Sequence, residues 1–326
     1  MVLALTLLVN SSVFAAEFYR VNKGTKEIIE EFGLCKTIEN NSSHDLFVPT
    51  KTKDEFSAFL THTPNGIAVS SCCPDGYIRV PAIEPYTIRS FCVAKYEMKN
   101  VGGVATSKAE GAPWVNITRD EARAKCATLG TGYSLITNAQ WQTIARNIEQ
   151  VAANWSGRAV GSGALNRGHS DSSPNSSLPA STDDDQACHQ TGQTCSSTTW
   201  HSQKRTHVLL NGEVIWDFSG NVAEWIYENA SDLALSFNLR LYAGWFEYPQ
   251  LTAEDRNLFG PSNSSWNSTQ GIGLLYSAGT ANGAILRGGG YTTTQEGSTG
   301  IYYANLNYSP LTVHQYFGFR CVFNPE

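Results

Sequence analysis

The sequence is poor in charged side chains and has no excess of basic ones. Asp, Glu, Lys and Arg make up 16% of its 326 residues, whereas soluble domains average roughly 25%. The 23 basic and 29 acidic side chains give a formal net charge of −6. Binding to DNA or RNA needs a concentrated basic surface. The composition therefore argues against a nucleic-acid partner.

Long apolar runs are also missing. Apart from the N-terminus, no stretch approaches the roughly 18 consecutive apolar residues of a membrane span, so we expect no membrane-spanning segment. Residues 1–15 combine a short apolar run with small residues, and Val13 and Ala15 stand at the −3 and −1 positions of a signal-peptidase site. We expect a signal peptide there and a periplasmic, cell-surface or extracellular protein. Because a basic start is missing, a buried strand is the alternative.

The cysteines lack the CxxC spacing of zinc knuckles and thioredoxin-type redox pairs. Their number is even, and in an exported chain this predicts up to four disulfides. Cys188 and Cys195 bracket a short loop, which favours a local disulfide over a redox function. The pairing among four others stays open at this stage: Cys35, Cys72, Cys73 and Cys92.

The composition changes near residue 77. Residues 16–76 carry short mixed signals, including a helical pattern at KEIIEEF, and are expected to form a small disulfide-stapled segment. From 77 to 326 we expect one α+β domain in which long loops outweigh short strands. The strands are expected at EVIWDF, AILRGGGY, IYYANLNY and FGFRCVF. Residues 154–207 are rich in small polar residues and too long for an ordinary loop unless metal or a disulfide orders them.

Two capping boxes mark two core helices. Thr118 precedes Glu121 by three residues and predicts a helix over 118–129 that ends at Gly130. Thr137 and Gln140 form the second box. The helix that follows carries apolar residues at i, i+3, i+4 and i+7 from position 141 onward, which predicts packing on a core rather than binding of a cofactor.

Several motifs in this order resemble the formylglycine-generating enzyme or sulfatase-modifying factor superfamily. They are FCVAKYEMKN, PWVNITRDEARAKCATLG, YSLITNAQWQTIAR, WDFSGNVAEW, LRGGGY and GFRC, and they cover about 77–326. The resemblance implies an irregular fold related to C-type lectins. It also implies a disulfide between Cys126 and Cys321, which would join the first core helix to the last strand.

The resemblance further implies structural calcium. The family's GN(A/V)WEW turn binds the ion through side-chain and main-chain oxygens, and hard oxygens suit Ca²⁺. A solvated turn with Asn221 in a left-handed conformation is the alternative. Carried over residue by residue, the first site comprises Asp217, Gly220, Val222 and Glu224. A second site would comprise Asn166, Arg167 and Asp184, with Asp183 or Asp185 as alternatives to the last.

One departure from the family bears directly on activity. Members that oxidise a sulfatase cysteine use a copper-binding cysteine pair after RGG(S/G)(W/Y), because Cu(I) prefers thiolates. Residues 288–320 contain no cysteine, so we expect no such activity and assign no catalytic residue. The iron-dependent branch takes histidines from a separate helical bundle, which residues 1–76 do not supply. His169, His189, His201 and His207 are expected to be scattered loop histidines rather than metal ligands.

The same C-terminal segment is rich in Tyr and Asn, like an antibody paratope, where rigid rings supply area and amides adapt their hydrogen bonds. The alternative is that half of these residues, Tyr303 and Phe317 above all, belong to the strand core. The expected ligand-binding residues are Tyr291, Tyr302, Asn305, Asn307, Tyr308, His314, Gln315 and Tyr316.

Two functions of different classes fit these observations. The favoured one is an exported, non-catalytic, adhesin-like protein that presents the C-terminal surface to an extracellular protein or glycan on a calcium- and disulfide-stabilised scaffold. The other is a metal-dependent oxidase of the sulfatase-modifying factor family. Metal analysis separates them, because calcium alone supports binding and copper or iron supports catalysis.

Overall fold

The computed structural model describes residues 18–22, 28–32, 44–47, 73–279, 283–292 and 297–325. The chain divides into two compact units, residues 1–72 and 73–326, so the division falls four residues before the expected one. In the first unit, β1 (Phe18–Asn22), β2 (Ile28–Phe32) and β3 (His44–Phe47) pair antiparallel. The helix expected at KEIIEEF is therefore wrong, since most of this segment forms β2. Its β-branched isoleucines also favour an extended backbone. The expected signal peptide, Cys35 and Cys72 lie outside the described residues.

Both capping boxes and both core helices of the second unit are confirmed. The Thr118 hydroxyl accepts from the Glu121 amide at 3.1 Å and precedes α2 (Arg119–Ala127), and Thr137 caps α3 (Asn138–Glu149) through Gln140 at 3.2 Å. Two shorter helices, α4 (Phe237–Leu241) and α5 (Ala253–Phe259), follow. Single 3₁₀ turns lie at η1 (Ala152–Asn154), η2 (Ala230–Asp232), η3 (Tyr248–Gln250) and η4 (Ser268–Gln270).

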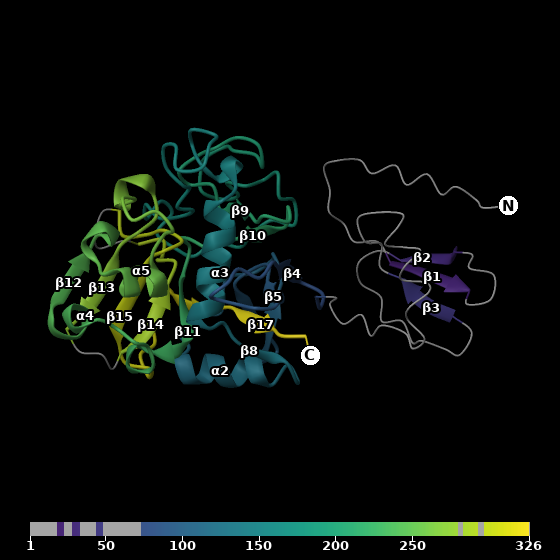
Figure 1. Cartoon of the computed structure of the whole chain (residues 1–326), viewed down its shortest axis with the longest axis horizontal. Coiled ribbons are helices and arrows are strands. Elements are labelled where there is room, and N and C mark those ends of the chain that lie inside the picture. Colours follow the sequence, from purple (N-terminus) through teal and green to yellow (C-terminus); the bar gives the residue numbers. More distant parts are fainter. Residues whose placement is uncertain are drawn as a thin grey trace. The chain divides into compact units, whose positions relative to one another are not determined.

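A six-stranded sheet in the order β12-β13-β15-β14-β11-β16 carries the C-terminal strands (Figure 1). Its strands are β11 (Ala223–Asn229), β12 (Ala243–Phe246), β13 (Leu275–Ala278), β14 (Ala284–Arg287), β15 (Ala304–Tyr308) and β16 (Phe317–Phe319). The α+β class is confirmed, but the strands are not all antiparallel: β11 runs parallel to β16, and β13 runs parallel to β15. On its other edge, β15 pairs antiparallel with β14.

A four-stranded sheet in the order β4-β5-β17-β8 joins the ends of this unit. Its strands are β4 (Tyr77–Val80), β5 (Phe91–Ala94), β8 (Tyr133–Leu135) and β17 (Cys321–Phe323). Two hairpins complete the unit, one of β6 (Met98–Val101) and β7 (Val104–Ser107), the other of β9 (Thr206–Val208) and β10 (Val214–Trp216). No helix in the described part of the chain is long and apolar enough for a bilayer span.

The main core forms around α3, which contacts both β11 and β4. Trp141 stacks on Phe218 with ring centroids 3.9 Å apart, and its indole nitrogen donates to the Ile301 carbonyl at 2.8 Å. Ile144 and Ile148 are fully buried on the same face. The apolar stripe of this helix is therefore core, as predicted.

Three disulfides lie in the second unit. Cys126–Cys321 joins α2 to β17 and Cys188–Cys195 closes a short loop, so both predicted pairs are confirmed. The third, Cys73–Cys92, resolves part of the pairing that the sequence left open. Cys92 lies in β5, so this disulfide fastens the first residue of the unit to the four-stranded sheet.

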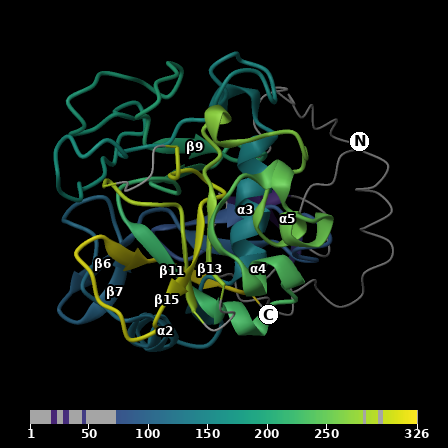
Figure 2. The ribbon, with the colours of Figure 1, turned by 90° about the vertical axis from the view of Figure 1, so that its left-hand side faces the viewer.

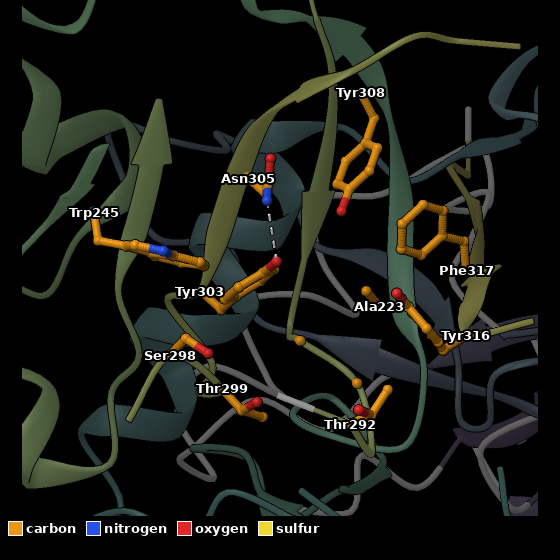
Figure 3. A pocket seen from close by; sticks show the side chains of 12 residues that line it. Ala223, Trp245, Thr292, Ser298, Thr299, Tyr303, Asn305, Tyr308, Tyr316 and Phe317 are labelled. Atoms are coloured by element: carbon orange, nitrogen blue, oxygen red, sulfur yellow. Dashed lines mark hydrogen bonds between the residues drawn. The ribbon is translucent and has the colours of Figure 1, made fainter. Parts of the chain in front are cut away.

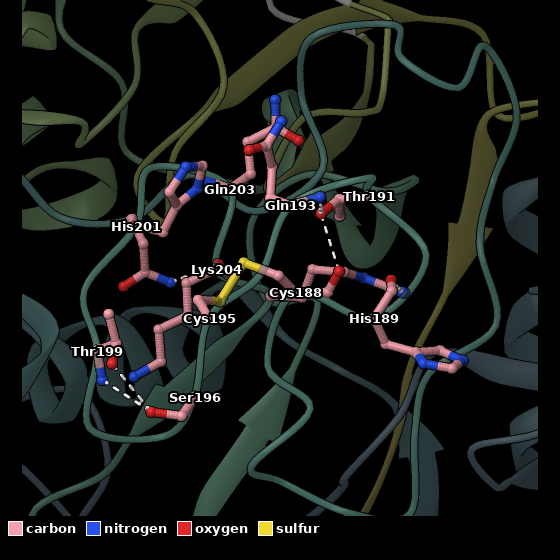
Figure 4. Close-up of a disulfide and its surroundings, with 12 residues drawn as sticks. Cys188, His189, Thr191, Gln193, Cys195, Ser196, Thr199, His201, Gln203 and Lys204 are labelled. Carbon is pink, nitrogen blue, oxygen red and sulfur yellow. Dashed lines mark hydrogen bonds between the residues drawn. A yellow bond between two sulfur atoms is a disulfide. The ribbon is translucent and has the colours of Figure 1, made fainter.

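Residues 155–205 form loops without helix or strand. Figures 1 and 2 show these loops gathered at one end of the unit. The Cys188–Cys195 disulfide lies within these loops, next to Lys204 (Figure 4). The Lys204 amine donates to the Ser197 carbonyl at 2.6 Å. Arg205 donates to the carbonyls of Pro179 at 2.8 Å and His189 at 2.9 Å. A disulfide and a buried arginine thus hold this segment.

A candidate ligand-binding pocket on the C-terminal strands

A small pocket opens over β11, β15 and β16 (Figure 3). Its cavity volume is about 60 Å³, well below the roughly 300–1,000 Å³ of pockets that enclose a small-molecule ligand. The pocket therefore suits the tip of a larger ligand that rests on the surface around it. It is lined by Ala223, Trp245, Gly289, Gly290, Thr292, Ser298, Thr299, Tyr303, Asn305, Tyr308, Tyr316 and Phe317.

Trp245 and Tyr303 form one wall of the pocket. Their ring centroids are 6.1 Å apart, and Trp245 also packs on Tyr276 at 5.1 Å across β12 and β13. The Asn305 amide nitrogen donates to the Tyr303 hydroxyl at 3.4 Å (Figure 3). This contact orients a phenol and an amide toward the same space.

The opposite wall is a second group of aromatic rings. Tyr308 and Tyr316 each pack edge-on against Phe317, with centroids 4.7 and 5.1 Å apart. The His314 ring lies 3.7 Å from that of Tyr316. Tyr308 and Tyr316 are only half-buried, so their edges and hydroxyls remain available to a ligand. Rings held in this way lose little conformational entropy on binding.

The glycine segment that follows β14 lines the pocket and packs closely against Thr299. A Cβ on Gly289 would lie 2.9 Å from the Thr299 hydroxyl oxygen, and its φ of +78° also favours glycine. Arg287 ends β14 and is fully buried. Its Nη1 donates to the Asn138 side-chain oxygen at 2.7 Å, and burial lowers the pKa of Arg287 to about 10. The strand that leads into the pocket is thus fixed to α3.

The titratable groups that line the pocket are tyrosines. Burial raises the pKa of Tyr303 and of Tyr308 above the ordinary value of 10.0. Both phenols are therefore neutral at pH 7 and can donate and accept hydrogen bonds. The described lining residues include no carboxylate, imidazole, amine or thiol, the groups that carry most acid–base and nucleophilic catalysis.

The structure separates the eight predicted ligand residues into groups. Asn305, Tyr308 and Tyr316 line the pocket, and His314 packs beside it. Asn307 and Gln315 are exposed but do not line it.

Two of the predicted ligand residues are buried instead. Tyr302 is 0% exposed and its hydroxyl donates to Glu149 at 2.7 Å, so it belongs to the core. Tyr291 is 3% exposed and stacks on His169. Tyr302 and Tyr303 precede β15, and the side chain of Tyr302 lies in the core whereas that of Tyr303 lines the pocket.

The sequence analysis missed several pocket residues. Tyr303 lines the pocket, and so do Trp245, Thr292, Ser298 and Thr299. Phe317 also borders the pocket, but it is 2% exposed and belongs to the core, as the alternative interpretation predicted. Trp245 comes from β12, which pairs with β13. A tryptophan between glycine and phenylalanine in YAGWFEY was the only local signal, and nothing in that pattern reveals the pairing partner.

In the first predicted calcium site, both carboxylates bind arginine side chains. Asp217 accepts from Arg205 through both oxygens at 2.7 Å, and Glu224 accepts from Arg320 through both oxygens at 2.8–3.2 Å. All four side chains are buried. Guanidinium groups thus hold the oxygens that a calcium ion would need.

The predicted backbone ligands Gly220 and Val222 lie in the turn between Asp217 and Glu224. Asn221 has the left-handed conformation of the alternative interpretation, with φ 60°. It is buried rather than solvated: its side chain donates to Glu97 at 2.6 Å and accepts from the Leu178 amide at 2.7 Å. The turn is therefore an internal hydrogen-bonded junction.

The residues of the second predicted calcium site have other contacts in the structure, although the buried side-chain oxygen of Asn166 accepts no hydrogen bond. Asn166 donates to the carbonyls of Lys204 and Thr206, at 2.7 and 3.1 Å, and the Arg167 carbonyl accepts from Ser219 at 3.1 Å. Asp184 instead binds Lys95 at 2.8 Å and the Trp216 indole at 2.7 Å. Within the described ranges, no three His, Cys, Asp or Glu side chains converge as a metal site.

The model of the sulfatase-modifying factor enzyme 1-like domain matches residues 43–325. No curated protein sequence matches the chain. Among solved structures, variable protein 1 of Treponema denticola is 13% identical with a TM-score of 0.36, over 76% of this chain and 92% of that one.

Variants of a major tropism determinant are similar to the same degree. The P3c variant is 16% identical with a TM-score of 0.39, and the I1 variant is 15% identical with a TM-score of 0.38. Each match covers 78% of this chain and 54% of the determinant. The chain thus spans about half the length of these determinants.

Proposed function

Because the chain belongs to the family of sulfatase-modifying factor enzyme 1-like domains, we propose that it is a binding member of that family. In this proposal it is an exported, adhesin-like recognition protein that holds an extracellular protein or glycan at the pocket over β11, β15 and β16. The observation that carries the proposal is the pocket lining: aromatic rings, an amide and small hydroxyls, with no carboxylate, imidazole, amine or thiol among the described lining residues.

The ring geometry supports recognition of a surface rather than enclosure of a small molecule. Trp245 and Tyr303 face Tyr308 and Tyr316 across a shallow opening (Figure 3). Tryptophan and tyrosine dominate binding energy in protein interfaces, where one end of the ring is packed and the other contacts the partner. Neutral phenols and the Asn305 amide would supply directional hydrogen bonds at the centre of such a contact.

Export is supported by the apolar start of the sequence and by the disulfides. Disulfides persist in oxidising compartments and are rare in reducing ones, and the second unit has three of them. The alternative, a metal-dependent oxidase, is supported by family membership. It lacks the cysteine pair expected between residues 288 and 320.

Two measurements test the proposal. Arrays of extracellular glycans and surface proteins should show ligands that bind the wild-type protein and not a Trp245→Ala/Tyr316→Ala double variant. Tyr227→Ala is the matched control, because Tyr227 is 40% exposed and packs on Arg123 outside the pocket. If every ligand of the wild type also binds the double variant, the pocket is not the binding site. Conversion of a sulfatase-derived cysteine peptide to formylglycine in the presence of copper, followed by mass spectrometry, would establish the oxidase instead.

A further inference from the structure

A second, larger cavity lies between the loops of residues 155–205 and η4. Its volume is about 550 Å³, which falls within the roughly 300–1,000 Å³ of small-molecule sites. It shares no lining residue with the pocket over β11, β15 and β16. It is lined by Ala164, Leu165, Arg167, Trp200, Ser202, Ser268, Thr269, Gly271 and Gly297.

Backbone hydrogen bonds hold the three segments around this cavity together. The Leu165 amide donates to the Gln270 carbonyl, and the Arg167 amide donates to the Ser202 carbonyl, both at 2.8 Å. Gly271 has φ +72°, and a Cβ there would lie 2.2 Å from the Leu165 carbonyl oxygen. The cavity is thus shaped by fixed backbone contacts and does not need a ligand to form.

Arg167 supplies an unused positive charge to the cavity. Seven other arginines are buried or half-buried, and each donates a hydrogen bond or packs on an aromatic ring: Arg119, Arg123, Arg146, Arg205, Arg256, Arg287 and Arg320. The half-buried Arg167 guanidinium has no such partner among the described residues. A guanidinium presents a planar fork of donors that matches a carboxylate or a sulfate.

The hydroxyl oxygens of Ser268 and Thr269 also line the cavity, and they can accept hydrogen bonds from a ligand. Ser268 donates its proton to Glu247, and Thr269 donates its proton to the Asn267 side-chain oxygen at 2.7 Å. A hydroxyl whose proton is already donated can only accept from a ligand. These two oxygens therefore match hydroxyl groups of a ligand.

Trp200 adds a flat apolar surface. Its indole nitrogen donates to the Asn154 carbonyl at 3.2 Å, which fixes the ring, and the side chain remains half-exposed in the cavity lining. An aromatic face of this kind packs against the apolar face of a sugar ring.

We propose that this cavity binds an acidic saccharide. Arg167 binds its carboxylate or sulfate, Ser268 and Thr269 accept from its hydroxyls, and Trp200 packs on a ring face. The proposal does not depend on the function proposed for the pocket over β11, β15 and β16.

The test uses trigalacturonate and sialyllactose as probes, with trigalacturonate methyl ester and lactose as their neutral counterparts. Calorimetric titration of the full protein should show binding of the acidic probes that is about tenfold or more tighter than binding of the neutral ones. Arg167→Ala should remove this preference, and Arg167→Lys should restore part of it. Trp200→Ala should weaken binding of all four sugars.

Arg79→Ala, at an exposed position on β4, is the matched control and should bind like the wild type. Thermal melting should be unchanged in Arg167→Ala, because the guanidinium has no described partner to lose. Tyr316→Ala should leave the saccharide affinity unchanged, which separates this site from the other pocket. Equal affinity for acidic and neutral sugars, no binding of either acidic probe, or unchanged affinity in Arg167→Ala would overturn the proposal.

Discussion

Arg205 donates two hydrogen bonds to Asp217, from Nε to Oδ1 and from Nη2 to Oδ2, each 2.7 Å long. The two side chains are 0% and 2% exposed. Nη1 and Nη2 also reach carbonyls in the loops of residues 155–205, including Leu178 at 3.1 Å. One buried ion pair therefore connects these loops to the turn before β11, at the place where the family resemblance implied calcium.

Removing the arginine of this pair should destabilise the protein strongly. Arg205→Leu leaves Asp217 buried without its counter-charge, and breaking a buried pair from one side costs about 3–5 kcal/mol. Urea denaturation should show this loss in the free energy of unfolding. Arg79→Leu, at an exposed position, is the control and should stay within about 0.5 kcal/mol of the wild type. A similar small effect for Arg205→Leu would mean that the pair does not hold the loops.

Chelation should leave the melting temperature unchanged. Asp217 and Glu224 direct both of their carboxylate oxygens at guanidinium groups. A calcium ion bound only by the native state would instead add about 2.7 kcal/mol at a hundredfold excess over Kd. Melting curves with EDTA and with added calcium decide between the two. A melting temperature that falls with EDTA, recovers with calcium and stops responding in Glu224→Gln would confirm the predicted calcium site.

The features that short-range patterns predicted correctly are those whose partners lie a few residues apart. Thr118 with Glu121 and Cys188 with Cys195 are examples, because a capping box or a short disulfide loop is complete within one local segment. The Cys126–Cys321 pair spans 195 residues and came only from the family resemblance. The pocket is the opposite case. Trp245 reaches it through pairing of β12 with β13, and no local pattern encodes that pairing.

The arginine partners of the predicted calcium ligands could not be foreseen for a related reason. The motif around Asp217 and Glu224 resembles a family turn, but the residues that neutralise it, Arg205 and Arg320, are 12 and 96 positions away. A positive side chain from another segment can take the place of a metal ion without altering the motif itself. Sequence spacing within the turn therefore could not distinguish a guanidinium from an ion.

Loss of the long-range disulfide should cost more than loss of the short one. Cys126→Ala/Cys321→Ala frees a loop of 195 residues and should lower the free energy of unfolding by about 2–5 kcal/mol. Cys188→Ala/Cys195→Ala opens a loop of only 7 residues, and the chain-entropy term grows with loop length. Urea denaturation of both double variants measures the difference. An equal or reversed order would indicate that native packing, not the denatured chain, sets these costs.

Buried His207 should make the protein less stable in acid. Its ring donates from Nε2 to the Asn166 carbonyl at 3.1 Å, and complete burial lowers its pKa to about 3 from 6.5. The folded state therefore binds fewer protons than the unfolded state between these values. The stability from His207 is fully present above pH 6.5 and is lost as the pH falls toward 3. Between pH 7 and pH 5 the loss should be about 2 kcal/mol.

The control for this pH effect is His207→Gln, which keeps a hydrogen-bond donor and cannot be protonated. Its unfolding free energy, measured in urea at both pH values, should fall less than that of the wild type. Parallel losses in the two proteins would show that carboxylates alone cause the acid sensitivity.

Tyr302 and Tyr316 should respond in opposite ways to truncation. Tyr302 is 0% exposed, its hydroxyl donates to Glu149 at 2.7 Å and its ring packs on Tyr248. Tyr302→Ala should therefore lower the free energy of unfolding by about 3–5 kcal/mol. Tyr316 is half-buried in the pocket lining. Tyr316→Ala should cost little stability and weaken ligand binding by about 1–3 kcal/mol.

Thermal melts of Tyr302→Ala, Tyr308→Ala and Tyr316→Ala test this division before a ligand is identified. Tyr302→Phe is the conservative control: it keeps the ring and removes only the hydroxyl that Glu149 accepts from, so its loss should be smaller than that of Tyr302→Ala. A large loss in all three alanine variants would place Tyr308 and Tyr316 in the core and remove the basis for the pocket. Tyr302 and Tyr303 are neighbours whose side chains point to opposite sides of the chain. A stable Tyr302→Ala variant would mean that Tyr302, and not Tyr303, faces the pocket, so the lining of the pocket would have to be reassigned.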